Sequence, residues 1–220
     1  MGRKATSSKD GRGGVVDSSR EVRAPRRRLS PEARRAELLT SALAVFATRG
    51  LGEARHAEIA EAAGVSVATV FFYFPTREAL VLAVLDEVAR FLLGMATDVH
   101  AGQGPADEVL LAHLRAFTDS VDSSPHHARV WLDWSTAVRE QTWQRYLEFL
   151  DRMLAIVRET LERGQREGSI SSASEADDQA RLLVGSAHMI SFMKFSGASA
   201  EKIEHFVGAL MEAVLGRRGA

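Results

Sequence analysis

The chain has 220 residues, 45% of them hydrophobic, which is enough for one large domain or two smaller ones. It contains no cysteine, and this excludes disulfide scaffolds and thiolate metal sites. The net charge of −1 is unevenly distributed, because residues 1–77 hold 14 of the 28 Lys and Arg but only 8 of the 29 Asp and Glu. Such a basic N-terminal third indicates a nucleic-acid-binding face, although a solvated basic tail would give the same count.

The sequence lacks the signals of a membrane or secreted protein. No apolar run approaches the roughly 20 residues that cross a bilayer. Residues 1–28 include no apolar stretch of the signal-peptide type. We therefore expect a cytoplasmic protein that makes no contact with a membrane.

The N-terminal segment has the composition of a disordered arm. Residues 1–28 are rich in Gly, Ser and charged residues and have few large apolar side chains. Such a segment cannot bury enough surface to offset the entropy of ordering. It ends in three consecutive cations, Arg26, Arg27 and Arg28.

From Ser30 onward the apolar residues recur with helical spacing, and no alternating strand pattern competes with them. In the first helix, Ser30 can cap the N-terminus, Pro31 suits the first position and Gly50 can end the helix. We expect an all-α fold. The seventh expected helix is either continuous or interrupted near its start. The expected helices are 31–49, 56–63, 67–73, 77–100, 106–123, 125–134, 136–168, 174–195 and 199–216.

Residues 56–73 have the pattern of a helix-turn-helix. Ala60 would lie where two short helices cross, and its small side chain allows close contact. Gly64 can adopt the left-handed turn conformation, Val65 would fill the core below the turn, and Ser66 can cap the second helix. A second helix of this size fits the major groove of DNA, whereas the alternative is an ordinary helical hairpin in an all-α core. The side chains expected on the outer face are Val67, Ala68, Thr69, Phe72 and Tyr73, with His56 at the start of the first helix.

Several short motifs lie in and around this hairpin: LSP at 29–31, HAEIAE at 56–61, VSVATVF at 65–71 and YFPTRE at 73–78. Two more follow, VWLDWS at 130–135 and ERG at 162–164. Through these motifs the segment from residue 30 to about residue 84 resembles the DNA-binding domain of the TetR family. Within that family it is most similar to the LuxR/HapR type of quorum-sensing master regulators.

The resemblance implies a TetR-like fold, with an N-terminal three-helix DNA-binding domain and a C-terminal helical domain for ligand binding and dimerisation. We accordingly expect a basic arm at 1–28, a DNA-binding domain at 29–76 and a regulatory and dimerisation domain at 77–220. The implied function is transcription regulation by a homodimer that binds a near-palindromic double-stranded DNA operator. The subgroup acts in quorum sensing, but the sequence leaves open whether cell density is the input here.

The resemblance also implies individual DNA contacts. The matching positions are Ser66, Thr69 and Tyr73 on the recognition helix, Thr76 and Arg77 at the start of the next helix, and Arg26, Arg27 and Arg28 of an arm that enters the minor groove. One position departs from the subgroup, which has Asn where this chain has Phe72. Asn can pair with adenine, whereas Phe makes only apolar contacts such as that with a thymine methyl group. We therefore expect the preferred operator to differ from the subgroup's.

Two apolar stripes near the C-terminus favour dimerisation, because in the family two such helices from each protomer form a four-helix interface. The alternative is that both stripes face the protein's own core. The expected interface residues are Leu183, Val184, Ala187, Phe206, Leu210, Met211 and Val214.

Eight apolar residues are candidates for a central cavity that binds an apolar or aromatic small molecule. A plain aromatic core would explain the same residues. They are Phe91, Met95, Leu114, Phe117, Trp131, Trp134, Met153 and Phe192.

We expect no cofactor and no metal, since the histidines form no His-x-x-x-His pair. We also expect no enzyme, because the chain has no nucleophile elbow, Walker loop or dinucleotide fingerprint. A different class of function stays open, namely a helical scaffold or small-molecule-binding protein whose helix-turn-helix has lost its DNA specificity. Phe72 is the residue that keeps this alternative open.

Overall fold

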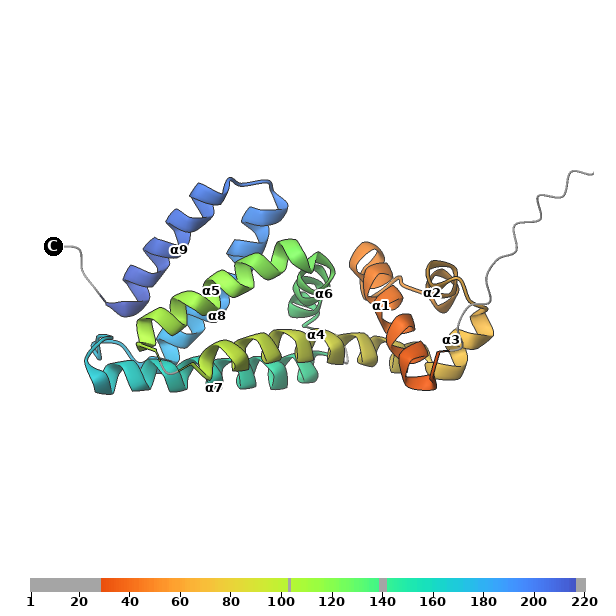
Figure 1. Cartoon of the computed structure of the whole chain (residues 1–220), viewed down its shortest axis with the longest axis horizontal. Coiled ribbons are helices and arrows are strands. Elements are labelled where there is room, and N and C mark those ends of the chain that lie inside the picture. The colour runs from red at the N-terminus through yellow and green to blue at the C-terminus, as the bar shows by residue number, and fades with distance from the viewer. Residues whose placement is uncertain (1–28, 103, 139–141, 217–220) are drawn as a thin grey trace, which may run out of the picture.

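The computed structural model describes residues 29–102, 104–138 and 142–216, and this part of the chain forms nine helices and no strand (Figure 1). The predicted all-α fold is confirmed. The helices are α1 Pro31–Arg49, α2 His56–Ala63, α3 Val67–Tyr73, α4 Arg77–His100, α5 Ala106–Ser123, α6 Pro125–Thr136, α7 Trp143–Glu167, α8 Ala176–Phe195 and α9 Ala200–Leu215. The arm at residues 1–28, with Arg26, Arg27 and Arg28, lies outside the described residues.

Helices α1, α2 and α3 form a small group at one end of the molecule (Figure 1). The first helix begins as its sequence predicts, because the Ser30 hydroxyl oxygen accepts a hydrogen bond from the Ala33 amide at 3.1 Å. Gly50 ends it with a φ of 84°. The buried side of α1 packs toward α2 and α6 and consists of Leu38, Ala42, Leu43 and Phe46.

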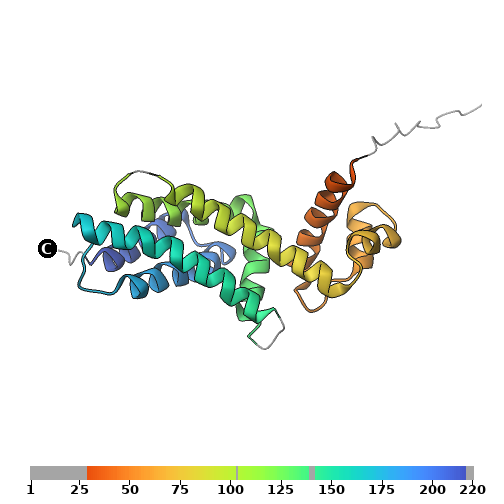
Figure 2. The ribbon, with the colours of Figure 1, turned by 90° about the horizontal axis from the view of Figure 1, so that it is seen from below.

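The long helix α4 connects this group to the rest of the molecule. It packs against α1 at one end and against α5, α6 and α7 further along. Figure 2 shows α4 and α7 running beside each other, with α8 and α9 further back. Because α4 belongs to both parts, a movement of its C-terminal half would be transmitted to the α1–α3 group.

The loop between α6 and α7 differs from the prediction. The expected helix from residue 136 is wrong at its start, since α6 continues to Thr136 and α7 begins at Trp143. Ala137 leaves the helical conformation, with a ψ of 46°. The indole N–H of Trp134 donates to the Thr142 carbonyl oxygen at 3.1 Å, so the fully buried Trp134 ties the two sides of the loop together.

No helix in the described part of the chain combines the length and the apolar character that a bilayer crossing requires.

Candidate nucleic-acid interface and central cavity

The helix-turn-helix has the geometry that its sequence predicts. Gly64 adopts the left-handed conformation, with φ 64° and ψ 39°, and its amide closes the end of α2. The Ser66 side-chain oxygen caps α3 by accepting a hydrogen bond from the Thr69 amide at 3.2 Å. The two hydroxyl oxygens of Ser66 and Thr69 lie 2.8 Å apart. The fully buried Val70 anchors α3, so the helix is held from one side only.

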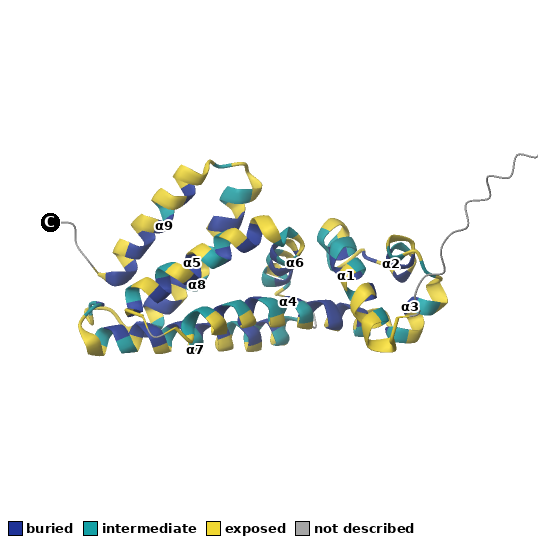
Figure 3. Ribbon diagram, viewed as in Figure 1, coloured by how far each residue is buried: buried dark blue, intermediate teal, exposed yellow. Residues whose placement is uncertain are grey.

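The opposite side of α3 faces outward. Phe72 is 78% exposed, and Val67 and Ala68 are also exposed, while Thr69 and Tyr73 are partly exposed. The Phe72 ring meets the edge of the Tyr73 ring at a centroid distance of 5.1 Å. Figure 3 shows exposed residues at the tip of the molecule that carries α3. Val67, Phe71 and Phe72 thus expose three large apolar side chains on one short helix, and apolar surface gathered in this way marks an interaction site.

His56 has a different place from the one expected of a DNA contact. Its ring is buried, and its Nε2 donates to the Phe74 carbonyl oxygen at 2.8 Å. The same ring stacks on Phe71 at 4.1 Å, with the two planes 5° apart. Because these contacts join the start of α2 to the C-terminal half of α3, His56 positions the recognition helix. Its predicted DNA contact is corrected to this positioning role, since the ring is buried.

The loop between α1 and α2 is bonded to α6, which lies far away in the sequence. Asp133 of α6 accepts a hydrogen bond from the Leu51 amide at 2.6 Å through its Oδ2 oxygen. The Leu51 carbonyl oxygen in turn accepts a hydrogen bond from the Arg77 guanidinium. Thr76, the residue before Arg77, caps α4 by accepting from the Ala79 amide at 3.1 Å. Thus Asp133 and Leu51 link the beginning of α4 to the α1–α2 loop in one hydrogen-bonded group. This loop leads into the helix-turn-helix of α2 and α3, which we call the reading head.

Between α4, α5, α6, α7 and α8 the structure contains a largely apolar cavity of about 280 Å³. This volume lies near the lower end of the range for small-molecule sites. Five of the eight predicted cavity residues line it: Met95, Leu114, Phe117, Trp131 and Met153. Sequence reasoning missed the rest of the wall, which is Leu92, His113, Tyr146, Phe149, Leu150, Leu154, Arg181, Leu183, Val184, Gly185, Ala187 and His188.

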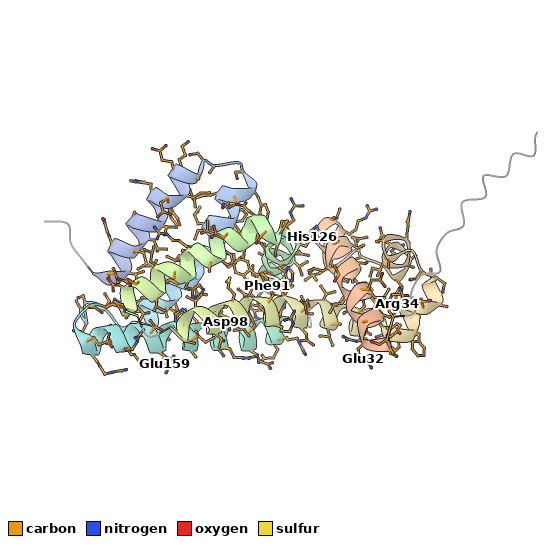
Figure 4. The ribbon with its side chains drawn as sticks, viewed as in Figure 1. Glu32, Arg34, Phe91, Asp98, His126 and Glu159 are labelled. Carbon is orange, nitrogen blue, oxygen red and sulfur yellow. The ribbon has the colours of Figure 1, made fainter. Side chains whose placement is uncertain are left out.

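The other three predicted cavity residues lie elsewhere. Phe91 stacks on His127 at 4.1 Å between α4 and α6 (Figure 4). Trp134 is fully buried in the core at the end of α6. Phe192 is 58% exposed on α8. Hydrophobicity selected all three, but the rotation of each helix turns them away from the cavity.

A polar group of three side chains reaches the cavity through His113. His100 on α4 places Nε2 at 2.7 Å from Nδ1 of His113 on α5, and its Nδ1 lies 2.7 Å from the hydroxyl oxygen of Thr160 on α7. Burial lowers the pKa of His113 to about 3, with a further contribution from His100. Burial and the charge of Arg163 lower the pKa of His100 to about 4. Both rings are therefore neutral at pH 7.

In the described part of the chain, no group of three or more His, Asp or Glu side chains could hold a metal ion.

Comparisons with known proteins agree with this architecture. The sequence profile described as "Bacterial regulatory proteins, tetR family" matches residues 38–84, from α1 into α4. The HTH-type transcriptional regulator LuxR of Vibrio harveyi is 33% identical over 193 residues, which are 86% of this chain and 92% of that protein. The chain belongs to the TetR family. It is a transcriptional regulator rather than an enzyme.

Solved TetR-type structures share the fold. A regulator from Chloroflexus aurantiacus has a TM-score of 0.72 at 20% identity and covers 82% of this chain and 93% of its own. The regulator FadR of Bacillus subtilis, solved in complex with stearoyl-CoA, has a TM-score of 0.69 at 18% identity and covers 84% of this chain and 99% of its own.

In this TetR-family chain the predicted dimer residues divide into two groups. Leu183, Leu210, Met211 and Val214 are buried inside the protomer, so the part of the prediction that rests on them is wrong. Val184, Ala187 and Phe206 are partly buried and pack against the same core. The helices α8 and α9 carry apolar residues on two sides. The prediction from helical spacing chose the side that faces the protein's own core.

The outer side of α8 carries the apolar residues that sequence reasoning left out of an interface. Leu182 and Met189 are each 50% exposed, and together with Gly185 and Phe192 they follow one another at intervals of three and four residues. This spacing places them on one face of the helix. The spacing was readable in the sequence, but nothing there distinguished the outer stripe from the inner one.

Proposed function

We propose that this TetR-family regulator binds a near-palindromic DNA operator as a homodimer, with α3 of each protomer in the major groove. The observation that carries the proposal is the outer face of α3. The helix is capped by Ser66, anchored on its inner side by Val70, and leaves most of the Phe72 side chain exposed to solvent. Two reading heads about 34 Å apart would meet successive major grooves. DNA binding is also our reason for placing the protein in the cytoplasm.

In this proposal some side chains on and next to α3 contact bases and others contact phosphates. Phe72, Thr69 and Tyr73 face the bases, as do the smaller Val67 and Ala68. Ser66, Thr76 and Arg77 bind phosphates, since helix N-termini and guanidinium groups favour anions. The cations Arg26, Arg27 and Arg28 enter the minor groove, and deletion of residues 1–28 should therefore flatten the dependence of operator affinity on salt.

The second protomer is proposed to lie against α8 and α9. Leu182, Met189 and Phe192 form an exposed apolar stripe on α8, and a stripe of this kind indicates a protein–protein contact. On α9, Gly208 and Ala209 are exposed and small, so a second copy could approach closely there. A two-fold axis through this surface would give a four-helix interface.

We further propose that a small molecule in the central cavity controls DNA binding. The cavity lies in the body of the protein, and its wall includes Trp131 of α6, the helix that is bonded to the reading head through Asp133. FadR of Bacillus subtilis, which shares the fold, binds stearoyl-CoA. The resemblance to LuxR-type regulators of quorum sensing leaves the input signal open.

Sequence selection from random duplexes tests DNA binding. The full-length protein should enrich one near-palindromic motif, and Thr69→Ala or Tyr73→Ala should weaken binding to it by about 10-fold, in line with the loss of one specific base contact. Thr48→Ala is the matched control, because Thr48 on α1 bonds only its own helix, at the Ala44 carbonyl. Failure to enrich any motif would favour the alternative of a helical protein with a degenerate reading head.

A further inference from the structure

The cavity wall contains a buried imidazole, one of whose ring nitrogens can form a hydrogen bond with a ligand. His113 lines the cavity and is 6% exposed. Its Nδ1 is taken by the hydrogen bond with His100, so Nε2 is the ring nitrogen that remains for a ligand. The ring lies one helical turn from Phe117, which also lines the cavity, and the neighbouring wall is mostly apolar. His113 is therefore a hydrogen-bonding point in a mostly apolar wall, which also contains the buried indole N–H of Trp131.

The direction of the hydrogen bonds in this group follows from Thr160. Other helical threonines, such as Thr48 and Thr118, donate their hydroxyl hydrogens to the carbonyl oxygen four residues earlier. For the buried Thr160, the hydrogen bond that the structure describes is the one with His100 Nδ1. A buried hydroxyl hydrogen requires an acceptor, so Thr160 donates to Nδ1 of His100.

The remaining protons are then fixed in turn. A neutral imidazole carries one N–H, and when Nδ1 of His100 accepts, Nε2 of His100 must donate. It donates to Nδ1 of His113, so the single N–H of His113 is at Nε2. Thr160 and His100 thus act as positioning residues: they select the tautomer in which His113 offers a donor to the cavity.

The one cation among the described residues of the cavity wall is already in an ion pair. His113 and His100 are neutral because burial keeps both pKa values well below 7. Among the described residues that line the cavity, Arg181 is the one Lys or Arg, and its Nε donates to Asp177 at 2.9 Å. A carboxylate or phosphate would have to compete with Asp177 for Arg181, and elsewhere in this space it would lie without a counter-ion, which is costly in an apolar environment.

We infer that the cavity binds an uncharged molecule with an apolar body and one carbonyl oxygen, which accepts a hydrogen bond from Nε2 of His113. The inference rests on the proposed ligand control and names the chemical class of the ligand. Ketones, esters and amides belong to this class; free carboxylic acids, which are ionised at pH 7.5, and pure hydrocarbons do not.

The test compares three probes of similar size with the full-length protein at pH 7.5. They are 4-phenylbutan-2-one, which has a carbonyl acceptor, butylbenzene, which has none, and 3-phenylpropanoate, which is anionic. Dissociation constants come from ligand-observed NMR titrations. The ketone should bind about 5-fold more tightly than butylbenzene, the factor expected of one net hydrogen bond, and more tightly than the anion.

Variants then assign the preference to the proposed group. His113→Phe should bring the ratio of the ketone and butylbenzene constants close to one. Thr160→Val should lower the same ratio, because His100 and His113 can then adopt the opposite tautomers, and Thr160→Ser should restore it. Thr118→Val on α5 is the control and should leave the ratio unchanged. If His113→Phe fails to fold, the Thr160 pair still decides.

Three results would overturn the inference: tighter binding of 3-phenylpropanoate than of the ketone, an unchanged ratio in Thr160→Val, or no binding of any probe at millimolar concentration. Operator selection on the same protein separates this failure from failure of the proposed function. A protein that enriches a DNA motif but ignores the ketone would refute the ligand class alone.

Discussion

At the scale of single residues, His56 of α2 supports one side of α3, while Phe72 on the other side of α3 is free to contact DNA. His56 is buried and bonded to the Phe74 carbonyl oxygen, whereas Phe72 on the other side of α3 touches little besides Tyr73. Substitution of a surface residue with few contacts changes the free energy of unfolding by about 0.5 kcal/mol or less. A change at Phe72 should therefore alter DNA recognition and leave folding intact.

Phe72→Asn is expected to change which operator is selected. An amide can form two hydrogen bonds with adenine, while Phe can only make apolar contact with a base, so the enriched motif should gain adenine at one position in each half-site. Sequence selection on both proteins measures this. Val138→Asn, at an exposed position between α6 and α7, is the control. An identical motif for Phe72→Asn and the parent would show that this side chain does not read a base.

The neutral histidine pair predicts a pH dependence of stability. The folded-state pKa of His113 is about 3 and that of His100 about 4, both below the ordinary value of 6.5. Below pH 6.5 the unfolded chain therefore binds more protons than the folded one. The stability that the neutral pair provides is fully present above pH 6.5 and is lost as the pH falls through 4 toward 3.

His113→Gln, which cannot titrate, should reduce the slope of unfolding free energy against pH by about 1 kcal/mol per unit between pH 4.5 and 6. Urea denaturation at several pH values gives the slope. His126→Gln, at an exposed position on α6 (Figure 4), is the matched control. A slope equal to that of the parent would mean that His113 is not held neutral by the fold.

At the scale of elements, α6 joins the cavity to the reading head. One side of this helix carries Trp131 into the cavity wall, and two residues later Asp133 binds the Leu51 amide between α1 and α2. A rigid helix moves as a unit, so displacement of Trp131 by a ligand would also displace Asp133. The α1–α2 loop and Arg77, which is bonded to Leu51, would follow.

Asp133→Ala should loosen this connection. Loss of a hydrogen bond to a charged acceptor costs about 1.5–3 kcal/mol, so the Leu51 amide should exchange its hydrogen at least about 10-fold faster. Hydrogen-exchange mass spectrometry on the α1–α2 loop measures the rate, and operator affinity should fall in parallel. Asp119→Ala, an exposed position on α5, serves as the control. Unaltered exchange at Leu51 would rule out Asp133 as the coupling residue.

At the scale of the whole molecule, function depends on how two copies present their reading heads. The α1–α3 group lies at one end of the long axis, and α9 lies toward the other, so dimerisation through α8 and α9 leaves α3 accessible (Figure 1). The exposed apolar side chains of Leu182, Met189 and Phe192 on α8 would be buried in such an interface and stabilise it.

Phe192→Glu should convert the dimer to a monomer, because a charge would be buried without a partner. Sedimentation equilibrium measures the mass, and operator affinity should fall by at least about 100-fold, since the two heads would no longer bind as one unit. Val138→Glu introduces the same charge at another exposed apolar position and should change neither property. A Phe192→Glu protein that remains dimeric would move the interface to another surface.

The sequence by itself determined most of the helices and the helix-turn-helix, because these depend on neighbours in the chain. A serine that caps α3 and a glycine that turns left-handed after α2 act within four residues of their own position. The buried side of α1 could likewise be predicted from helical spacing.

Tertiary structure alone decided which of two apolar stripes on α8 faces inward and where the polar cluster lies. Periodicity identifies a stripe but not its partner, so Leu183 was assigned to the dimer surface and Phe192 to the cavity, the reverse of their burial. His100 and Thr160 are 60 positions apart, and no local sequence pattern predicts their hydrogen bond. Such contacts arise only when helices that are separate in sequence pack together, since packing fixes the rotation of each helix.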